Sequence, residues 1–243
     1  MASTFFDPGD QRAAKVGDLF ARIAPRYDLI NDLQSFGLHR LWKRRVIRLA
    51  RPQPGERALD VCCGTGDLAL GLARCGAQVA GLDFTEPMLD VATRRRSEKR
   101  AHFVRADAQQ IPFRDSSFHI VTVGYGLRNL ANWETGLCEM RRVATAGGRL
   151  LVLDFGKPDN ALWRSLYFGY LRIFVPWLGR VFCGNAAAYS YILESLKHYP
   201  AQHGVAAKMR DLGLVNVRVI NLLGGVMTIN FGEKGGRGLM RET

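Results

Sequence analysis

The sequence lacks the features that mark membrane-spanning, secreted and zinc-binding proteins. No stretch of about eighteen apolar residues is free of charge, so we expect no spanning helix. Residues 1–8 have neither a basic start nor a long apolar segment, so we expect no signal peptide. The five cysteines include no C-x-x-C pair, so we expect no zinc site, and reduced thiols in the cytoplasm fit best.

Signatures of nucleic-acid binding are also absent, although the chain is basic. The net charge is +12, yet there is no zinc finger, RRM signature or run of five lysines. Part of the excess lies in residues 94–100, which we interpret as the solvated face of a helix. We therefore expect no nucleic-acid partner. A chain of 243 residues is long enough to bury a large single core.

Short apolar segments alternate with helical patterns in the middle of the chain. We predict strands at 57–61, 78–82, 102–105, 118–123 and 149–153, and helices at 67–75, 87–99 and 132–143. Strands that alternate with helices imply an α/β fold with a parallel sheet and right-handed crossovers. Two last strands, at 216–222 and 225–231, are joined by a short glycine turn and should run antiparallel.

Helical segments flank this alternating part. Before it we predict helices at 15–24 and 39–50, with an irregular stretch at 26–38. After it, Pro176 should divide an apolar segment into two helices, and further helices are predicted at 189–197 and 203–212. No linker divides the chain. We predict one domain, residues 1–243, with a helical lid at 15–50, a cofactor-binding core at 57–155, a helical insertion at 160–200, and a C-terminal helix and strand pair at 203–234.

The stretch at 57–70 organises the predicted core, because an apolar strand ends there in a glycine turn that opens a helix. Gly64 and Gly66 allow backbone N–H groups to approach a ligand closely. Asp67 is suited to cap the helix that follows. The pattern Gly64-x-Gly66-x-x-Ala69 also fits the loose dinucleotide fingerprint, which is weak evidence when it stands alone.

Two aspartates follow the next two predicted strands. A carboxylate after the second strand, here Asp83, is placed to accept hydrogen bonds from ribose hydroxyls. Asp107, after the third strand, can accept from an adenine amino group. Each aspartate alone could be a helix cap or a loop residue. Together they favour an adenosyl-containing ligand, and leave NAD and S-adenosylmethionine open.

Resemblance to known families separates these cofactors. Residues 60–66 (DVCCGTG) resemble the first motif of class I S-adenosylmethionine-dependent methyltransferases, with Cys62 in place of the usual first glycine. Residues 27–43, 126–129 and 189–195 resemble signatures of the ubiquinone/menaquinone C-methyltransferase family. The resemblance implies a Rossmann-like sheet, mostly parallel with an antiparallel C-terminal strand, with helices on both faces and an N-terminal helical lid. The chain departs from the pattern where it lacks Lys-Pro before two glycines, and at Asp154 and Asn230.

The resemblance also implies two sets of site residues and a cofactor, S-adenosylmethionine. The residues implied at the cofactor are Cys63, Gly64, Thr65, Gly66, Asp83, Asp107, Ala108 and Gly124. The residues implied at the second substrate are Tyr27, Arg128 and Asn129 as catalytic groups, with Asn31 and His39 nearby. The family reaction moves a methyl group from a sulfonium to a ring carbon of a reduced prenylated quinone, and it requires no metal.

Arg128 has the most specific expected role. A guanidinium stays charged in proteins, so we do not expect Arg128 to act as a base. We expect it to stabilise developing oxyanion charge, or to orient a water that removes the quinol proton. Tyr27 and Asn129 would hold that water or a ring oxygen. The alternative is a structural arginine paired with an acid such as Glu134 or Asp154.

The acceptor and the class of reaction leave alternatives. Demethylmenaquinol, in menaquinone biosynthesis, is the favoured acceptor, and 2-methoxy-6-polyprenyl-1,4-benzoquinol, in ubiquinone biosynthesis, is the alternative. A nicotinamide oxidoreductase is disfavoured by the antiparallel end and the leader signature. A basic RNA-directed methyltransferase or nucleic-acid-binding module remains a further alternative.

Residues 162–182 suggest contact with a membrane. They are either a packed helical insertion or an apolar wall for the prenyl tail, with Arg164, Arg172 and Arg180 near lipid headgroups. We therefore expect a cytoplasmic protein in transient, peripheral contact with the inner surface of the cytoplasmic membrane. A homodimer is compatible with the sequence.

Overall fold

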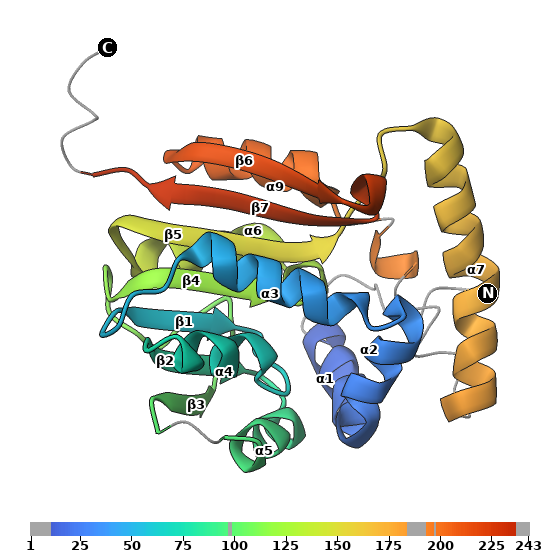
Figure 1. Cartoon of the computed structure of the whole chain (residues 1–243), viewed down its shortest axis with the longest axis horizontal. Helices are drawn as coiled ribbons and strands as arrows, with labels where there is room; N and C mark the ends of the chain where they lie inside the picture. The colour runs from blue at the N-terminus through green and yellow to red at the C-terminus, as the bar shows by residue number, and fades with distance from the viewer. Residues whose placement is uncertain (1–10, 97–98, 184–192, 197, 237–243) are drawn as a thin grey trace.

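One mixed β-sheet forms the centre of the molecule (Figure 1). The structure, a computed structural model, describes residues 11–96, 99–183, 193–196 and 198–236. The strands of the sheet are β1 (Arg57–Val61), β2 (Gln78–Asp83), β3 (Ala101–Arg105), β4 (Phe118–Gly124), β5 (Ala144–Phe155), β6 (Leu214–Leu222) and β7 (Met227–Lys234). They lie in the order β3-β2-β1-β4-β5-β7-β6. Neighbours from β3 to β5 are parallel, whereas β7 pairs antiparallel with β5 and β6. The predicted mostly parallel sheet with an antiparallel C-terminal strand is confirmed.

Helices precede, connect and follow these strands. The α-helices are α1 (Gln11–Ile23), α2 (Tyr27–Ser35), α3 (Leu38–Ala50), α4 (Asp67–Arg74), α5 (Glu86–Arg94), α6 (Trp133–Val143), α7 (Ala161–Cys183) and α9 (Ala201–Asp211). Short 3₁₀ turns lie at Ala24–Arg26, Leu127–Asn129 and Leu223–Gly225. The helix predicted at 189–197 falls largely outside the described residues, of which 193–196 are helical.

Alternate residues of the central strands β1, β4 and β5 enter two separate apolar cores. On β4, Val121 and Val123 pack in a cluster that includes residues of α6 and α9, whereas Ile120 packs with residues of α3 and α4. Successive side chains of a strand point to opposite faces of its sheet, so helices cover both faces. Figure 1 shows α3 and α4 in front of the sheet, with α6 and α9 behind it.

The N-terminal leader, defined here as α1 to α3, differs from the expectation in one place. The stretch at 26–38, predicted to be irregular, contains the helix α2. The described side chains of α2 are partly exposed, with Leu29 57% exposed, so the helix is held by contacts with its neighbours and not by a buried apolar face. It contacts α3, and the hydroxyl of Tyr170 on α7 donates to the carbonyl oxygen of Gln34, 3.0 Å away. A segment held on several sides does not need one apolar stripe to be helical.

Helix α7 also differs from the prediction, because it continues through Pro176. A proline inside a helix removes one backbone donor and crowds the preceding turn, at a cost of about 3 kcal/mol. In a helix of 23 residues the turns on either side keep their own hydrogen bonds, and the helix persists. Figure 1 shows α7 standing beside α2, beyond the end of the sheet. Within the described residues, no helix combines the length and the apolarity needed to cross a bilayer.

The beginning of β5 is a third difference. Residues 144–148, which separate the predicted helix from the predicted strand, already belong to β5. Ala144 pairs with Phe118, and the register then shifts before Ile120 pairs with Arg149. Gly147 has a positive φ of 73° at this irregularity, a conformation that glycine adopts without strain. The glycines therefore lie at an irregularity within a long strand.

Candidate active site

A cleft opens at the carboxyl ends of β1, β2 and β4, where ligands bind in sheets of this kind. It encloses about 780 Å³ of space, part of which is open to solvent. The floor includes Cys62, Gly64, Asp83, Asp107, Ala108 and Gly124, and the leader contributes Val16, Gly17, Phe20 and Tyr27. The leader therefore covers the edge of the sheet at which the glycine turn lies.

The turn after β1 is held in a sharp left-handed conformation. Cys62, Gly64 and Gly66 have φ values of 52°, 53° and 86°. Cys62 is strained there, because a side chain rarely adopts this region. Gly66 is required for space as well, since a Cβ at this position would lie 3.1 Å from Ala92 and from Phe103. The amide of Cys63 donates to the carbonyl oxygen of Leu82, which ties the turn to β2.

Asp67 does not cap α4, contrary to the prediction. The N-cap residue is Gly66, and the Asp67 carboxylate instead binds Lys43 and Arg95. The cap comes from the strand, because the buried carboxylate of Asp60 accepts from the amide of Ala69 at 3.0 Å. Burial raises the pKa of Asp60 to about 7, although this hydrogen bond opposes the shift. The carboxylate thus fastens the strand to the first turn of the helix.

Asp83 and Asp107 both line the cleft, as the spacing of the strands indicated. Asp83 accepts from the amides of Gly64 and Thr85, at 2.9 and 2.8 Å, so it braces the glycine turn. Burial raises the pKa of Asp83. Asp107 accepts from the amide of Gln109 at 2.8 Å. These carboxylates fit an adenosyl ligand, since each oxygen can accept a further hydrogen bond.

Five of the other six cofactor residues implied by the resemblance line one or both of two neighbouring cavities. Gly64, Ala108 and Gly124 line the cleft with the two aspartates. Cys63 and Thr65 instead line a smaller neighbouring cavity of about 320 Å³. The hydroxyl of Thr65 donates to Asp28 of the leader at 2.9 Å. Gly66 lines neither cavity, and its role is to close the turn.

Of the residues expected at the second substrate, Tyr27 and Asn129 line the cleft. The ring of Tyr27 lies edge-on to Phe20, with centroids 6.0 Å apart. His39 lies in the leader, where its Nδ1 is 2.9 Å from the hydroxyl of Ser35, and burial lowers the pKa of its imidazole. Neither His39 nor Asn31 lines the cleft, and within the part of the chain that the structure describes, Nε2 of His39 and Nδ2 of Asn31 are buried without a hydrogen-bond partner.

Arg128 is buried, with its side chain only 5% exposed, and does not line the cleft. It forms an ion pair with Asp154 at 2.9 Å, and its guanidinium lies 4.7 Å from the centroid of Phe155. It also donates to the carbonyl oxygen of Tyr125 and, from Nε, to Ser195 at 3.2 Å. The pairing alternative is therefore present, with Asp154 as the acid. A catalytic role for Arg128 stays a prediction.

Tyr125 is a cleft residue that the sequence analysis missed. It lines both cavities, and its hydroxyl is buried with no hydrogen-bond partner among the described residues. Its φ of 63° is unusual for a bulky residue and brings its carbonyl oxygen to Arg128 and Asn129. The one signal in the sequence was an aromatic residue between two glycines at the end of a strand.

Comparison with known proteins identifies the family. The model of the ubiE/COQ5 methyltransferase family matches residues 9–234. The chain belongs to this family. It is 41% identical to the ubiquinone/menaquinone biosynthesis C-methyltransferase UbiE of Ectopseudomonas mendocina, over 93% of this chain and 91% of that protein. It is 39% identical to the UbiE protein of Azotobacter vinelandii, over 93% and 92%.

Solved structures with low sequence identity share the fold of this methyltransferase. A methyltransferase of Thermotoga maritima, described as a possible histamine N-methyltransferase, aligns with a TM-score of 0.64 at 18% identity, over 89% of this chain and 99% of that one. Phosphoethanolamine N-methyltransferase 2 of Haemonchus contortus, in complex with S-adenosylhomocysteine, aligns with a TM-score of 0.62 at 15% identity, over 80% and 52%. The class I methyltransferase fold and S-adenosylmethionine as methyl donor are confirmed. The assignment of individual residues to the cofactor stays a prediction.

Proposed function

We propose that this methyltransferase transfers a methyl group to a ring carbon of demethylmenaquinol, a reduced quinone with a prenyl tail. The observation that carries the proposal is the 41% identity to a UbiE protein over nearly the whole chain. The cleft supports it, because the leader covers the cofactor side with Phe20 and Tyr27, and aromatic side chains suit a flat quinol ring.

The cofactor supplies an electrophilic methyl group, and the residues of the chain position the two reactants. Asp83 and Asp107 hold the adenosyl end through their carboxylates, while the turn at Gly64 admits close backbone approach. Tyr27 and Asn129 contact the acceptor ring or the water that removes its phenolic proton. Loss of that proton raises electron density at the ring carbon that is methylated. Alignment of the reactants in the cleft beneath the leader contributes the rest.

The Arg128–Asp154 pair acts in this proposal through the loop that carries it. Arg128 donates to the carbonyl oxygen of Tyr125, and the side chain of Asn129 donates to the same oxygen at 3.1 Å. The pair thereby orients Tyr125 and Asn129 at the cleft. Its net charge is neutral, so it stabilises developing oxyanion charge less than an unpaired arginine would.

A labelling experiment tests the proposed acceptor. The protein is incubated with methyl-labelled S-adenosylmethionine and either reduced demethylmenaquinone or reduced 2-methoxy-6-polyprenyl-1,4-benzoquinone, and the products are analysed by mass spectrometry. We expect label on the naphthoquinol ring, and no product with the oxidised quinones. Label on the benzoquinol alone would favour the ubiquinone pathway, and label on neither ring would refute quinol methylation. To test dependence on the cofactor site, Asp83→Ala, which changes a cleft residue, is compared with Asp90→Ala, which changes an exposed aspartate.

An exposed apolar stripe on α7 supports contact between the enzyme and a lipid surface. Leu162, Leu166 and Ile173 are 72%, 58% and 74% exposed and recur at helical spacing on one side of α7. Arg172 is exposed beside them, and the whole chain carries a net charge of +12. We propose that this stripe contacts an anionic bilayer, from which the prenyl tail reaches the enzyme.

Sedimentation with vesicles tests this contact. We expect the protein to bind vesicles that contain phosphatidylglycerol, and to bind less at high salt. Leu162→Ser/Leu166→Ser/Ile173→Ser should abolish binding without loss of methylation of a short-tailed quinol. Equal binding by the triple variant, or none by the wild type, would refute the role of the stripe.

A further inference from the structure

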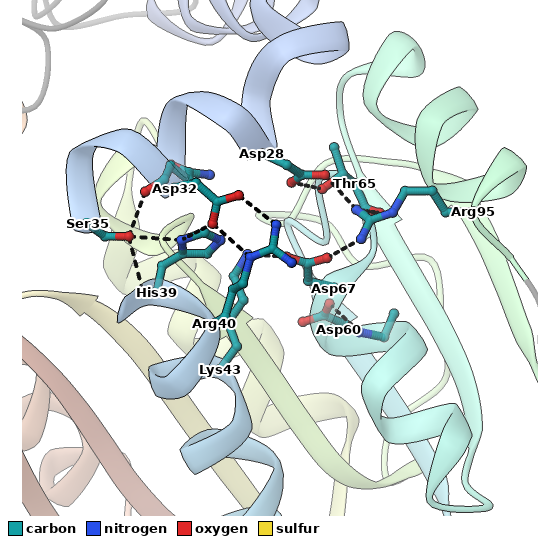
Figure 2. A network of polar contacts seen from close by, with 12 residues as sticks. Asp28, Asp32, Ser35, His39, Arg40, Lys43, Asp60, Thr65, Asp67 and Arg95 are labelled. Carbon is teal, nitrogen blue, oxygen red and sulfur yellow. Dashed lines mark hydrogen bonds and ion pairs between the residues drawn. The ribbon is translucent and has the colours of Figure 1, made fainter. Parts of the chain in front are cut away.

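A network of charged side chains joins the leader to the cofactor turn (Figure 2). Asp28 lies in the first turn of α2, and Arg95 directly follows α5. The guanidinium of Arg95 donates to Asp28 at 2.8 Å, to the carbonyl oxygen of Thr65 at 3.0 Å and to Asp67 at 2.6 Å. Asp28 accepts in turn from the hydroxyl of Thr65. Arg95 thus connects α2, the glycine turn and the start of α4.

Lys43 on α3 adds a second connection to the same turn. Its ammonium donates to Asp67 at 2.6 Å, on the carboxylate oxygen that Arg95 does not bind. The cluster of Asp28, Lys43, Asp67 and Arg95 is neutral as a whole. Burial alone would raise the pKa of Asp67, but Lys43 and Arg95 outweigh it and hold this pKa at about 2. The Asp67 carboxylate is therefore charged at neutral pH, and its ion pairs with Lys43 and Arg95 are complete.

The exposure of the cluster sets its strength. The side chains of Asp28 and Arg95 are 31% and 38% exposed, so their contact is more than a surface pair and less than a buried one. Single surface pairs contribute little, whereas one guanidinium with several charge-assisted bonds fixes geometry as well. Contacts of this strength hold an element in place and still allow it to open.

The position of α2 matters because Tyr27 precedes Asp28 directly. A Cβ on Gly64 would lie 4.0 Å from the Tyr27 ring, so this ring covers the glycine turn at the cleft. The rest of the leader covers the cleft through Val16, Gly17 and Phe20. A cofactor as large as S-adenosylmethionine enters or leaves most readily when the leader lifts from this edge.

We propose that Arg95 is a positioning residue: with Asp28 it clamps α2 onto the cofactor turn, keeps Tyr27 over the cleft, and slows release of the bound cofactor. The clamp consists of Asp28, Thr65 and Arg95, with Asp67 and Lys43 as its second connection. The inference rests on the cofactor and on the described contacts, and it does not depend on which quinol is methylated.

Two measurements without the methyl acceptor test the clamp in Arg95→Gln, Asp28→Asn and the double variant. Hydrogen exchange of the ligand-free protein should show faster exchange of α2 amides, and stopped-flow fluorescence should show faster release of S-adenosylhomocysteine. We expect about ten-fold changes in both, the effect of one lost charge-assisted bond. The double variant should resemble Arg95→Gln, because that change already breaks the contact with Asp28 together with those to Thr65 and Asp67.

Matched variants separate the clamp from a general loss of structure. Arg94→Gln removes the same charge from the exposed neighbouring position and should leave both rates unchanged. Arg95→Lys should restore the rates in part, since an ammonium keeps the charge without the fork of donors. Unchanged rates in Arg95→Gln, or equal changes in Arg94→Gln, would overturn the proposal. So would faster exchange across the whole sheet, which would mean global destabilisation.

Steady-state kinetics provide a readout that loss of folded protein would not mimic. A weakened clamp should raise KM for S-adenosylmethionine about ten-fold with a smaller change in kcat, whereas partial unfolding would lower kcat alone. A loss of kcat with no change in the KM for S-adenosylmethionine would contradict the clamp. If neither quinol is methylated, the exchange and release measurements still decide the role of Arg95.

Discussion

Two arginines hold the walls of the cleft in different ways. Arg128 and Asp154 are 5% and 2% exposed and form a closed pair behind the cleft. Arg95 and its partner Asp28 are 38% and 31% exposed and lie at the junction of the leader and the cofactor turn. A buried pair has no water to replace a lost partner, so it suits a part that must not move. A half-exposed pair can exchange its partner for water, which suits a part that opens.

The largest effect is expected from breaking the buried pair. Arg128→Met leaves the Asp154 carboxylate buried without its cation, so we expect the free energy of unfolding to fall by about 3–5 kcal/mol. Urea denaturation measures this change. Arg128→Met/Asp154→Leu removes both charges and should regain much of the loss. A fall below about 1 kcal/mol would mean that water reaches Asp154, and the contrast between the two arginines would disappear.

An intermediate effect is expected at Lys43, which is 11% exposed in its side chain. Lys43→Met keeps the apolar stem but removes the bond to Asp67 and the cation 5.7 Å from the ring centroid of Tyr125. We expect a loss of about 1–2 kcal/mol in urea denaturation. Lys208→Met, which breaks a more exposed pair with Glu134 at 3.5 Å, should cost less than about 0.5 kcal/mol. Equal losses would show that burial does not rank these pairs.

The clamp should respond to acid through Asp67. The pKa of this carboxyl falls from 3.8 to about 2 in the folded protein, so its contribution to stability is complete above pH 3.8 and is lost as the pH falls toward 2. We expect the protection of α2 amides, measured against the intrinsic exchange rate at each pH, to fall over this range in the wild type. Asp67→Asn should exchange faster at neutral pH and lack this part of the pH dependence. A parallel pH profile in both proteins would show that Asp67 does not control the leader.

The smallest expected effect is that of salt. Raising NaCl from 0.1 to 1 M shortens the Debye length from about 10 Å to about 3 Å, which weakens the half-exposed clamp but not the buried pair. We expect release of S-adenosylhomocysteine to become about two-fold faster in the wild type. In Arg95→Gln the rate should hardly depend on salt. The same salt response in both proteins would assign it to another part of the molecule.

The strands were predictable because short-range patterns define them. β1 has the predicted bounds, and β2 and β4 each extend one residue beyond them. Each is an apolar segment that ends at a turn residue, and this is a local property. Helix α2 was missed because contacts with other elements hold it in place. Of these elements, α3 lies across a turn and α7 is distant in the sequence. The break predicted at Pro176 was wrong, because the cost of a proline is local, whereas the persistence of α7 depends on all of its turns.

At the site, the sequence by itself determined the glycine turn after β1, the aspartate that ends β2 and the aspartate after β3, because the ends of parallel strands meet at one edge whatever surrounds them. It also determined the family, through long signatures. Only the tertiary structure decided which side chains pair. Asp67 pairs with Lys43 and Arg95 and does not cap α4, and Arg128 pairs with Asp154. Charged groups pair with the partners that folding brings within about 3 Å, and those partners lie on elements far apart in the chain.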